Sequence, residues 1–312
     1  MGKVITIGEI LVEIMAKEIG QTFLHAGDYR GPFPSGAPAI FIDQVAKSGS
    51  PAKIISAVGK DGFGEVNLNR LESNGVDVSN IKVLEDETTG VAFVTYKEDG
   101  DRDFIYHISN AACGRINKNY ISKEDFEDCS YFHIMGSAIY NEGIRETINK
   151  GRRLAKKYGC KISFDPNIRK EIVNDKEKKE LLLNILYEAN IVLAGEDELY
   201  YLTENKDEKS NVENLFNKNA EIVIIKRGSK GVTLYTHNKT VDISPYKVEE
   251  VDPTGAGDCF GGTFISCINQ EIEVEKATRL ATIAGAKAVT KKGPMEGNTT
   301  LEELEEVYKE LY

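Results

Sequence analysis

Hydrophobic and polar positions follow two periods along most of the chain, and stretches of one alternate with stretches of the other. Short runs of aliphatic and β-branched residues predict strands, at Lys3–Gly8, Lys53–Val58, Lys161–Phe164, Asn190–Ala194 and Glu221–Lys226. Longer stretches with apolar residues three or four apart predict helices, at Ala37–Ser48, Gly64–Asn74, Glu142–Tyr158, Lys176–Ala189, Val212–Asn217, Val274–Lys291 and Leu301–Leu311. This alternation predicts an α/β fold with a mostly parallel sheet and helices on both of its faces.

One region breaks the alternation. Gly90–Tyr96 and Arg102–Ile108 both have strand-like composition, and the Asp99-Gly100 pair between them favours a hairpin turn. The irregular segment Ile10–Pro34 has no helical period and could add strands beside this hairpin. We interpret the two regions together as a small β appendage, with a plain surface hairpin as the alternative.

The composition indicates an ordinary globular protein. The 312 residues are 41% hydrophobic and 29% charged, which is enough apolar material for a large core. We expect a single domain over residues 1–312. No apolar run approaches the ~20 residues that span a bilayer, and no signal segment precedes the first strand. The expected location is therefore the cytoplasm, with no membrane partner.

The charge and the cysteines exclude some classes of partner. The formal net charge is −11, and an acidic surface repels phosphate backbones, so a nucleic-acid partner is not expected. The five cysteines are widely spaced and form neither a CxxC pair nor a zinc-like cluster with the four histidines. We expect them to be reduced thiols that act as small apolar residues.

The most informative stretch is Val251–Thr263, with the sequence VDPTGAGDCFGGT. A strand is expected over Tyr246–Val251, and an apolar helical run begins near Ala256. Gly255 and Gly257 lie between them, where glycines let backbone N–H groups approach an anion without obstruction. The helix N-terminus adds partial positive charge. This stretch therefore predicts a phosphate site in an otherwise acidic protein.

Asp258 falls in the first turn of that helix. Acidic residues in first turns usually just complement the helix dipole. Here, however, a carboxylate stands beside a phosphate-sized site, which suits a base that takes a proton from an attacking hydroxyl. The chain has no GxxxxGK[ST] motif, and Gly255, Gly257 and Gly261 are spaced GxGxxxG, which is not the dinucleotide-binding fingerprint.

At these residues the chain resembles the PfkB/ribokinase family of carbohydrate kinases, in its fructokinase and 2-keto-3-deoxygluconate kinase branches. Asp252–Gly262 matches the family signature D-[TP]-x-G-A-G-D throughout. Four further segments resemble family motifs and extend the resemblance over essentially the whole chain, at Ser35–Pro38, Gly59–Glu65, Phe164–Arg169 and Lys226–Val232. The resemblance implies a three-layer α/β/α ribokinase-like core with a β-sheet lid, formed by roughly residues 10–34 and 88–110.

The resemblance also implies roles for particular residues. Asp258 would be the catalytic base, and the anion hole would consist of Gly255, Ala256 and Gly257. Gly36, Glu13, Arg169 and His107 would contact the substrate. The nucleotide site would use Lys226, Gly228, Gly231 and Ala284.

Cofactors and assembly follow from the same resemblance. Glu198 would act on Mg²⁺ through ordered water, and ATP would be the phosphoryl donor. Potassium could bind near Asp252 and Thr254, and two lids could pair in a homodimer.

Three positions depart from the family pattern. Ile40 stands where the sugar turn usually has asparagine, and Glu13 replaces an aspartate that binds sugar hydroxyls in many members. Both changes bear on substrate choice. Gly195 replaces the asparagine of the N-x-x-E motif, although Glu198 remains.

The lid sequence bears on whether the sugar carries an acid group. Keto-acid kinases of this family often have a lid arginine that pairs with a carboxylate, and His107 occupies that place here, with Arg102 and Arg115 nearby. A neutral histidine does not form the two parallel hydrogen bonds that arginine forms. We therefore expect a neutral, fructose- or tagatose-like ketohexose. The alternatives are 2-keto-3-deoxygluconate, a nucleoside or sugar phosphate, and a non-catalytic sugar-binding regulator.

Overall fold

A computed structural model describes residues 1–98, 102–168 and 175–312 of the chain. Over these residues the central sheet has ten strands, namely β1 (Lys3–Ile7), β4 (Ala52–Gly59), β5 (Val76–Asp77), β6 (Ile81–Leu84), β9 (Cys129–Met135), β10 (Lys161–Asp165), β11 (Ile191–Gly195), β12 (Ile222–Lys226), β13 (Val232–Thr236) and β14 (Thr240–Ile243). Their order is β14-β13-β12-β11-β10-β9-β1-β4-β5, with β6 also paired to β4. The pairing is parallel except where β13 joins β12 and β14, as the alternating pattern predicts.

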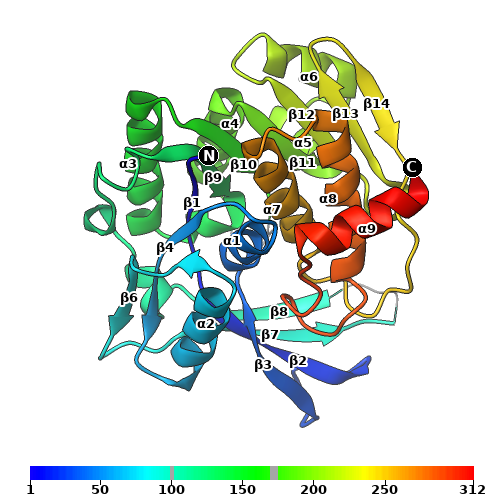
Figure 1. Ribbon diagram of the computed structural model, residues 1–312. Coiled ribbons are helices and arrows are strands. Elements are labelled where there is room, and N and C mark those ends of the chain that lie inside the picture. The colour runs from blue at the N-terminus through cyan, green and yellow to red at the C-terminus, as the bar shows by residue number, and fades with distance from the viewer. Residues whose placement is uncertain (99–101, 169–174) are drawn as a thin grey trace.

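Helices cover both faces of this sheet, so the core has three layers (Figure 1). One face carries α3 (Glu142–Tyr158), α4 (Lys176–Glu188), α5 (Glu196–Thr203) and α6 (Glu208–Phe216). The other carries α1 (Ala37–Lys47), α2 (Gly62–Ser73), α7 (Ala256–Asn269), α8 (Val274–Ala288) and α9 (Leu301–Leu311). Successive strand residues enter opposite layers because side chains alternate across a strand. In β1, for example, Ile5 and Ile7 pack under the first set of helices and Val4 under the second.

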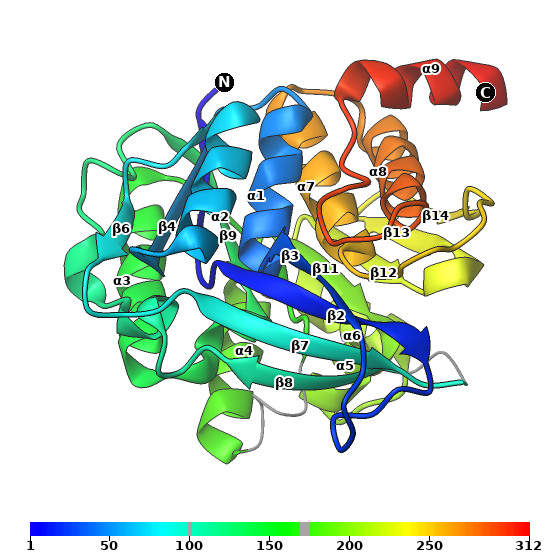
Figure 2. The same ribbon diagram turned by 90° about the horizontal axis from the view of Figure 1, so that it is seen from below.

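A second sheet lies below the core in Figure 1 and faces the viewer in Figure 2. Its four strands over the described residues are β2 (Leu11–Ile19), β3 (Tyr29–Ser35), β7 (Gly90–Tyr96) and β8 (Arg102–His107), in the order β3-β2-β7-β8. The prediction that the irregular segment Ile10–Pro34 adds strands beside the hairpin is confirmed. The expected turn residues Asp99 and Gly100 lie outside the described residues. We call this four-stranded sheet the lid.

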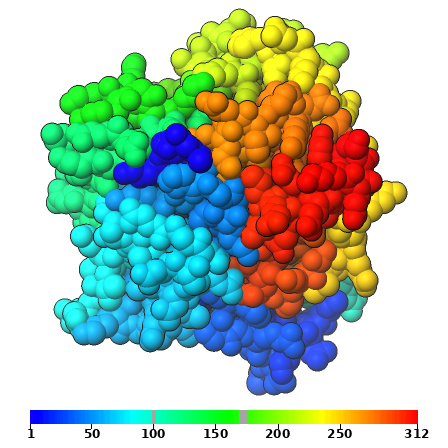
Figure 3. All heavy atoms as spheres, viewed as in Figure 1, coloured from blue at the N-terminus to red at the C-terminus, as the bar shows by residue number. Residues whose placement is uncertain are grey.

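The lid lies against the segment that follows α8. The space-filling view shows lid residues (blue) beneath the segment that leads into α9 (orange-red) (Figure 3). The fit is tight, because a Cβ added to Gly293 would lie 2.7 Å from the ring of Phe33. The lid therefore lies across the end of the core that carries the glycine turn before α7.

The strands differ from the sequence prediction in two ways. The segment before the glycine turn, expected as a strand over Tyr246–Val251, has no regular secondary structure. The amides of Val251 and Asp252 instead donate to Val289 O after α8, so a loop and not a sheet satisfies this backbone. Conversely, β9 was not among the expected strands, and nor were β5, β6, β13 and β14. In β9, His133 is fully buried, with its ring stacked on Phe41 at 3.7 Å and its Nδ1 2.9 Å from Ser163 Oγ.

The cysteines also differ from expectation. Cys129 and Cys160 form a disulfide across 31 residues of sequence, because they lie at the starts of the neighbouring strands β9 and β10. The expectation of five reduced thiols is therefore wrong for this pair. Cys113, Cys259 and Cys267 are free and buried, as expected of small apolar residues. Among the described residues, no helix has the length and apolar character needed to cross a membrane.

Candidate active site

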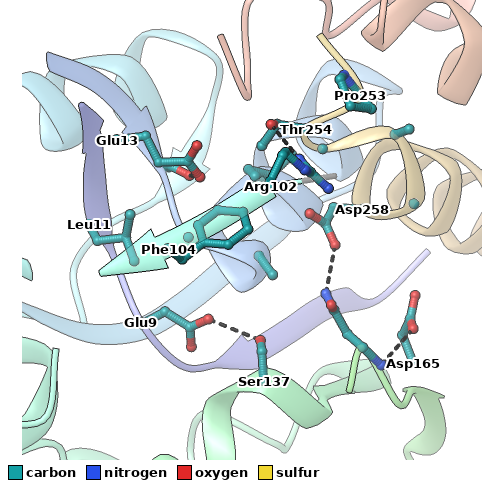
Figure 4. Close-up of a pocket in the computed structure, with 18 of the residues that line it drawn as sticks. Glu9, Leu11, Glu13, Arg102, Phe104, Ser137, Asp165, Pro253, Thr254 and Asp258 are labelled. Atoms are coloured by element: carbon teal, nitrogen blue, oxygen red, sulfur yellow. Dashed lines mark hydrogen bonds between the residues drawn. The ribbon is translucent and has the colours of Figure 1, made fainter. Parts of the chain in front are cut away.

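A cavity of about 190 Å³ lies between the lid and the carboxyl edge of the central sheet. Residues at or shortly after the ends of β1, β9, β10, β11 and β12 line its core side, and alternate residues of β2 and β8 line its lid side. Figure 4 shows Glu9, Glu13, Asp165, Thr254 and Asp258 converging on this space. The crevice at the carboxyl ends of parallel strands is where ligands bind in open α/β sheets.

The glycine turn before α7 forms one wall of the cavity. Gly255 is the N-cap residue of α7 with φ +83°, and an added Cβ would lie 2.5 Å from Pro294 O. Gly257 is different, because an added Cβ would meet only Lys226 Nζ, at 3.5 Å. Gly255 is therefore required by the backbone, whereas Gly257 keeps the approach to the cavity open. The amides at this helix start form a ready anion site.

Asp258 lies in the first turn of α7, with only 7% of its surface exposed, and it lines the cavity. Asn167 Nδ2 donates to Asp258 Oδ1 at 3.2 Å, and the backbone N–H of Asn167 donates to Asp165 Oδ1 at 3.1 Å. Asn167 has φ +35° in the turn after β10. Sequence reasoning gave no role to Asn167, although it lies within the motif at the end of this strand. The structure shows that Asn167 orients the Asp258 carboxyl group.

Lys226 supplies positive charge beside the glycine turn. Its Nζ forms an ion pair with Asp165 within the cavity wall. Burial works to lower the pKa of Lys226, but the carboxylates of Asp165 and Glu198 outweigh it and raise that pKa above its ordinary value. Burial also raises the pKa of Asp165, and Lys226 opposes that shift. Lys226 therefore remains a cation next to the anion site.

Glu198 lines the same cavity, at the start of α5. Its Oε2 accepts from the N–H of Gly195 at 2.8 Å, and its Oε1 accepts from the N–H of Ile168 at 2.7 Å. A Cβ at position 195 would lie 2.9 Å from Oε2, so glycine lets the glutamate fold back in this way. The described residues contain no group of three or more His, Cys, Asp or Glu side chains that could hold a metal by themselves. Mg²⁺ usually keeps several waters and binds through substrate phosphates, so the Glu198 carboxylate would reach it through water.

Carboxyl and hydroxyl groups line the opposite end of the cavity. Ser35 Oγ donates to Glu13 Oε1 at 2.6 Å, and Ser137 Oγ donates to Glu9 Oε1 at 3.0 Å. Gly36 lines this end, and its φ of +108° and the nearby Glu9 O, 2.5 Å from an added Cβ, require glycine. Glu9 was missed as a site residue, although it stands only four residues before Glu13, which the sequence analysis named. Such groups suit the hydroxyls of a polyol.

The lid contributes Arg102 and Phe104, and not His107. Side chains alternate across β8, so Arg102, Phe104 and Tyr106 face the cavity while His107 points to the outer face of the lid. The ring of His107 packs edge-on against Phe93 there, at 6.2 Å. The structure therefore does not bring His107, expected to contact the substrate, to this cavity. Arg115, the other arginine considered, is paired with Glu87 and does not line the cavity.

The remaining expected residues are scattered. Ile40 lines the cavity as an apolar contact against Gly255. Gly228 and Gly231 lie in the β12–β13 turn, and Ala284 is buried in α8, so none of the three lines this cavity. A second cavity, of about 300 Å³, opens along α8 and is lined in part by segment 244–247, Arg279, Thr282 and Ile283. Arg169 lies outside the described residues.

Comparison with known proteins agrees with this geometry. Residues 1–301 match the family described as pfkB family carbohydrate kinase. A solved structure from E. coli, described as a candidate ribokinase II in complex with ATP and Mg²⁺, is 45% identical with a TM-score of 0.94, and the alignment covers 99% of this chain and 100% of that one. It is similar to this chain over the whole fold, lid included.

Two curated relatives come from Arabidopsis thaliana. "Probable fructokinase-3" is 30% identical over 215 residues, which are 66% of this chain and 62% of that protein, so the match spans less than two thirds of it. "Probable fructokinase-2" is 28% identical over 301 residues, covering 94% of this chain and 91% of that protein. With a family match over residues 1–301 and the glycine turn, Asp258 and lid in one cavity, the chain belongs to the pfkB family of carbohydrate kinases.

Proposed function

We propose that this protein transfers the γ-phosphoryl group of MgATP to a terminal hydroxyl of a small sugar, with residues 1–312 acting as one kinase domain. One observation carries the proposal. Asp258, the anion-binding amides and the buried carboxyl groups of Glu9 and Glu13 share a single cavity under the lid. This arrangement suits proton removal and phosphoryl transfer between two ligands held side by side.

The chemistry follows from these positions. The sugar hydroxyl attacks the γ-phosphorus, its proton passes to Asp258, and the bond between that phosphorus and the oxygen retained by ADP breaks. The N–H groups of Gly255, Ala256 and Gly257 and the Lys226 ammonium stabilise negative charge on the transferring group. Asn167 holds the accepting carboxyl in place. Mg²⁺, associated with Glu198 through water, would neutralise charge on the phosphates.

The nucleotide and the lid complete the site. We place the phosphates at the glycine turn and the rest of ATP along α8, towards the cavity beside Thr282 and Ile283. The lid excludes water, which would otherwise compete with the sugar as acceptor.

A neutral ketohexose is the substrate class that we propose. Glu9, Glu13 and Asp258 put three carboxyl groups around the sugar position, and their oxygens accept hydrogen bonds from hydroxyls. The fructokinases among the relatives support the same class. Three carboxyl groups also disfavour a negatively charged sugar.

One observation favours a sugar acid as the second candidate. Arg102, not His107, faces the cavity, and no carboxylate in the described part of the chain forms an ion pair with it. An arginine in this position could pair with a carboxylate such as that of 2-keto-3-deoxygluconate.

The test is ADP release with a panel of fructose, tagatose, 2-keto-3-deoxygluconate, ribose and a nucleoside, against a control without acceptor. We expect sugar-dependent ADP release, with the highest kcat/KM for a ketohexose. A tenfold preference for the sugar acid would refute the neutral class while leaving the kinase proposal intact. Sugar binding without ADP release for any acceptor would indicate a regulator instead. Potassium activation and a lid-to-lid homodimer stay predictions.

A further inference from the structure

Two lid residues that face each other across the β7–β8 hairpin both contact the core. Tyr96 and Arg102 are directly opposed in the register of these strands. Arg102 Nη1 donates to Thr254 Oγ1 at 2.9 Å, a contact that Figure 4 shows beside the cavity. Lys292 Nζ lies 3.8 Å from the ring centroid of Tyr96, which is a cation–π contact. The pair Tyr96 and Arg102 therefore contacts two separate segments of the core, one at Thr254 and the other at Lys292.

These two core segments are themselves tied together by one buried carboxylate. Asp252 Oδ1 accepts from Thr254 Oγ1 at 2.8 Å and from the Thr254 N–H at 3.1 Å. Asp252 Oδ2 accepts from the N–H of Gly293 at 3.1 Å, and Gly293 directly follows Lys292. Asp252 has no exposed surface. The lid pair, the two core segments and Asp252 thus form a closed ring of contacts.

The position of Thr254 gives this ring a consequence for catalysis. Thr254 directly precedes Gly255, the first residue of the glycine turn, so its side chain bonds limit the turn's freedom at one end. Anion-hole amides are effective only when they are already placed where charge develops. A lid that opens must break the bond from Arg102 to Thr254 and release this restraint.

We propose that Tyr96, Arg102, Thr254 and Lys292 form a clamp that couples lid closure to the geometry of the glycine turn, with Arg102 as a positioning residue for phosphoryl transfer. This proposal rests on the proposed function of the same cavity. It differs from a role in which Arg102 binds a substrate carboxylate. In that role Arg102 would act on the KM of acidic sugars alone, and independently of Thr254.

Lid protection in the protein without substrates tests the clamp without any need for activity. Hydrogen–deuterium exchange is measured for Arg102→Gln, Thr254→Val, Thr254→Ser and the Arg102→Gln/Thr254→Val double variant. Arg115→Gln is the matched control, since that arginine pairs with Glu87 outside the cavity. We expect faster exchange in both β7–β8 and the residues around Gly255 for Arg102→Gln and for Thr254→Val. Thr254→Ser, which keeps the hydroxyl, and the control should exchange like wild type.

The same proteins are then compared in turnover with the best sugar of the panel. We expect Arg102→Gln and Thr254→Val each to lower kcat about 10- to 100-fold, with the KM for ATP changed less than about threefold. The kcat of the double variant should fall no more than about threefold below that of the less active single variant, because Thr254→Val already removes the contact that Arg102→Gln removes.

Two results would overturn the clamp. One is a kcat loss in the double variant that equals the product of the losses in the two single variants. The other is hydrogen–deuterium exchange that becomes faster in the lid of these variants but not around Gly255. An effect of Arg102→Gln confined to the KM of sugar acids would assign Arg102 to carboxylate binding instead. If wild-type protein phosphorylates none of the acceptors, the proposed function fails, while the exchange measurement still decides the clamp.

Discussion

Gly255 and Gly257 stand two residues apart in one motif, but their roles in the structure differ. Alanine at Gly255 should lower the stability of the fold, whereas alanine at Gly257 should lower kcat. At Gly255 the backbone has φ +83°, and an added Cβ would lie 2.5 Å from Pro294 O. The left-handed conformation costs a non-glycine residue about 1–2 kcal/mol, and the contact with a backbone oxygen forces a further shift. We expect Gly255→Ala to lose about 2–4 kcal/mol of unfolding free energy.

Gly257 lies within α7 and has open space where a side chain would project, apart from Lys226 Nζ at 3.5 Å. Gly257→Ala should therefore fold normally, and the lower entropy of its unfolded chain stabilises it by up to ~1 kcal/mol. Its methyl group, however, intrudes where a phosphate must approach the amides and Lys226. Loss of one anion-hole contact lowers kcat about 10²–10³-fold, and we expect a decrease towards this range.

The assay pairs calorimetric melting with ADP release and sugar binding by titration calorimetry. At ~2.1 cal/mol/K per residue, a chain of 312 residues shifts its Tm by about 1.5 °C for each kcal/mol. Gly255→Ala should then melt about 3–6 °C lower, and Gly257→Ala at or slightly above the wild-type Tm. Sugar affinity should stay within about threefold for Gly257→Ala. A Gly257→Ala variant that keeps more than a third of wild-type kcat, or that melts as low as Gly255→Ala, would refute the reasoning.

Three further predictions follow from the same structure. Asp258→Asn should keep the fold and ATP binding but lower kcat at least ~10²–10⁴-fold; retention of more than about a tenth of the activity would contradict its role as base. Glu13→Gln should raise the KM for the sugar and leave the KM for ATP unchanged, because its carboxyl group lies at the sugar end of the cavity; an equal change in both constants would count against that placement. Burial lowers the pKa of His133 to about 3, while the unfolded residue titrates near 6.5, so below that pH the unfolded state binds a proton that the folded state does not. Stability from this residue should therefore decline as pH falls, by about 2 kcal/mol at pH 5. Urea unfolding at pH 7 and pH 5 should show this decline in wild type but not in His133→Gln, and equal pH dependence in both would exclude it.

Much of the fold was predictable because the local period of hydrophobic positions determines where helices and strands form. The helices at Glu142–Tyr158 and Leu301–Leu311 begin and end where the sequence pattern predicted. β9 escaped prediction because its burial comes from position and not from pattern. It lies between β1 and β10 in the middle of the sheet, where even His133 is enclosed on both faces. The segment before Val251 is the opposite case. Its composition is typical of a strand, but it forms none, because it does not pair with a neighbouring strand.

The same division holds for the site. The sequence by itself determined the glycine turn and the place of Asp258 in the first turn of a helix, because both are local arrangements of backbone and side chains. Only the tertiary structure decided which lid residue faces the cavity, since a shift of one position along a strand reverses the direction of a side chain. That parity puts Arg102 inside and His107 outside. The tertiary structure alone also brought Asn167 to Asp258 across 91 residues and Arg102 to Thr254 across 152. Contacts between residues so distant in sequence depend on how strands and loops pack, and no local pattern encodes them.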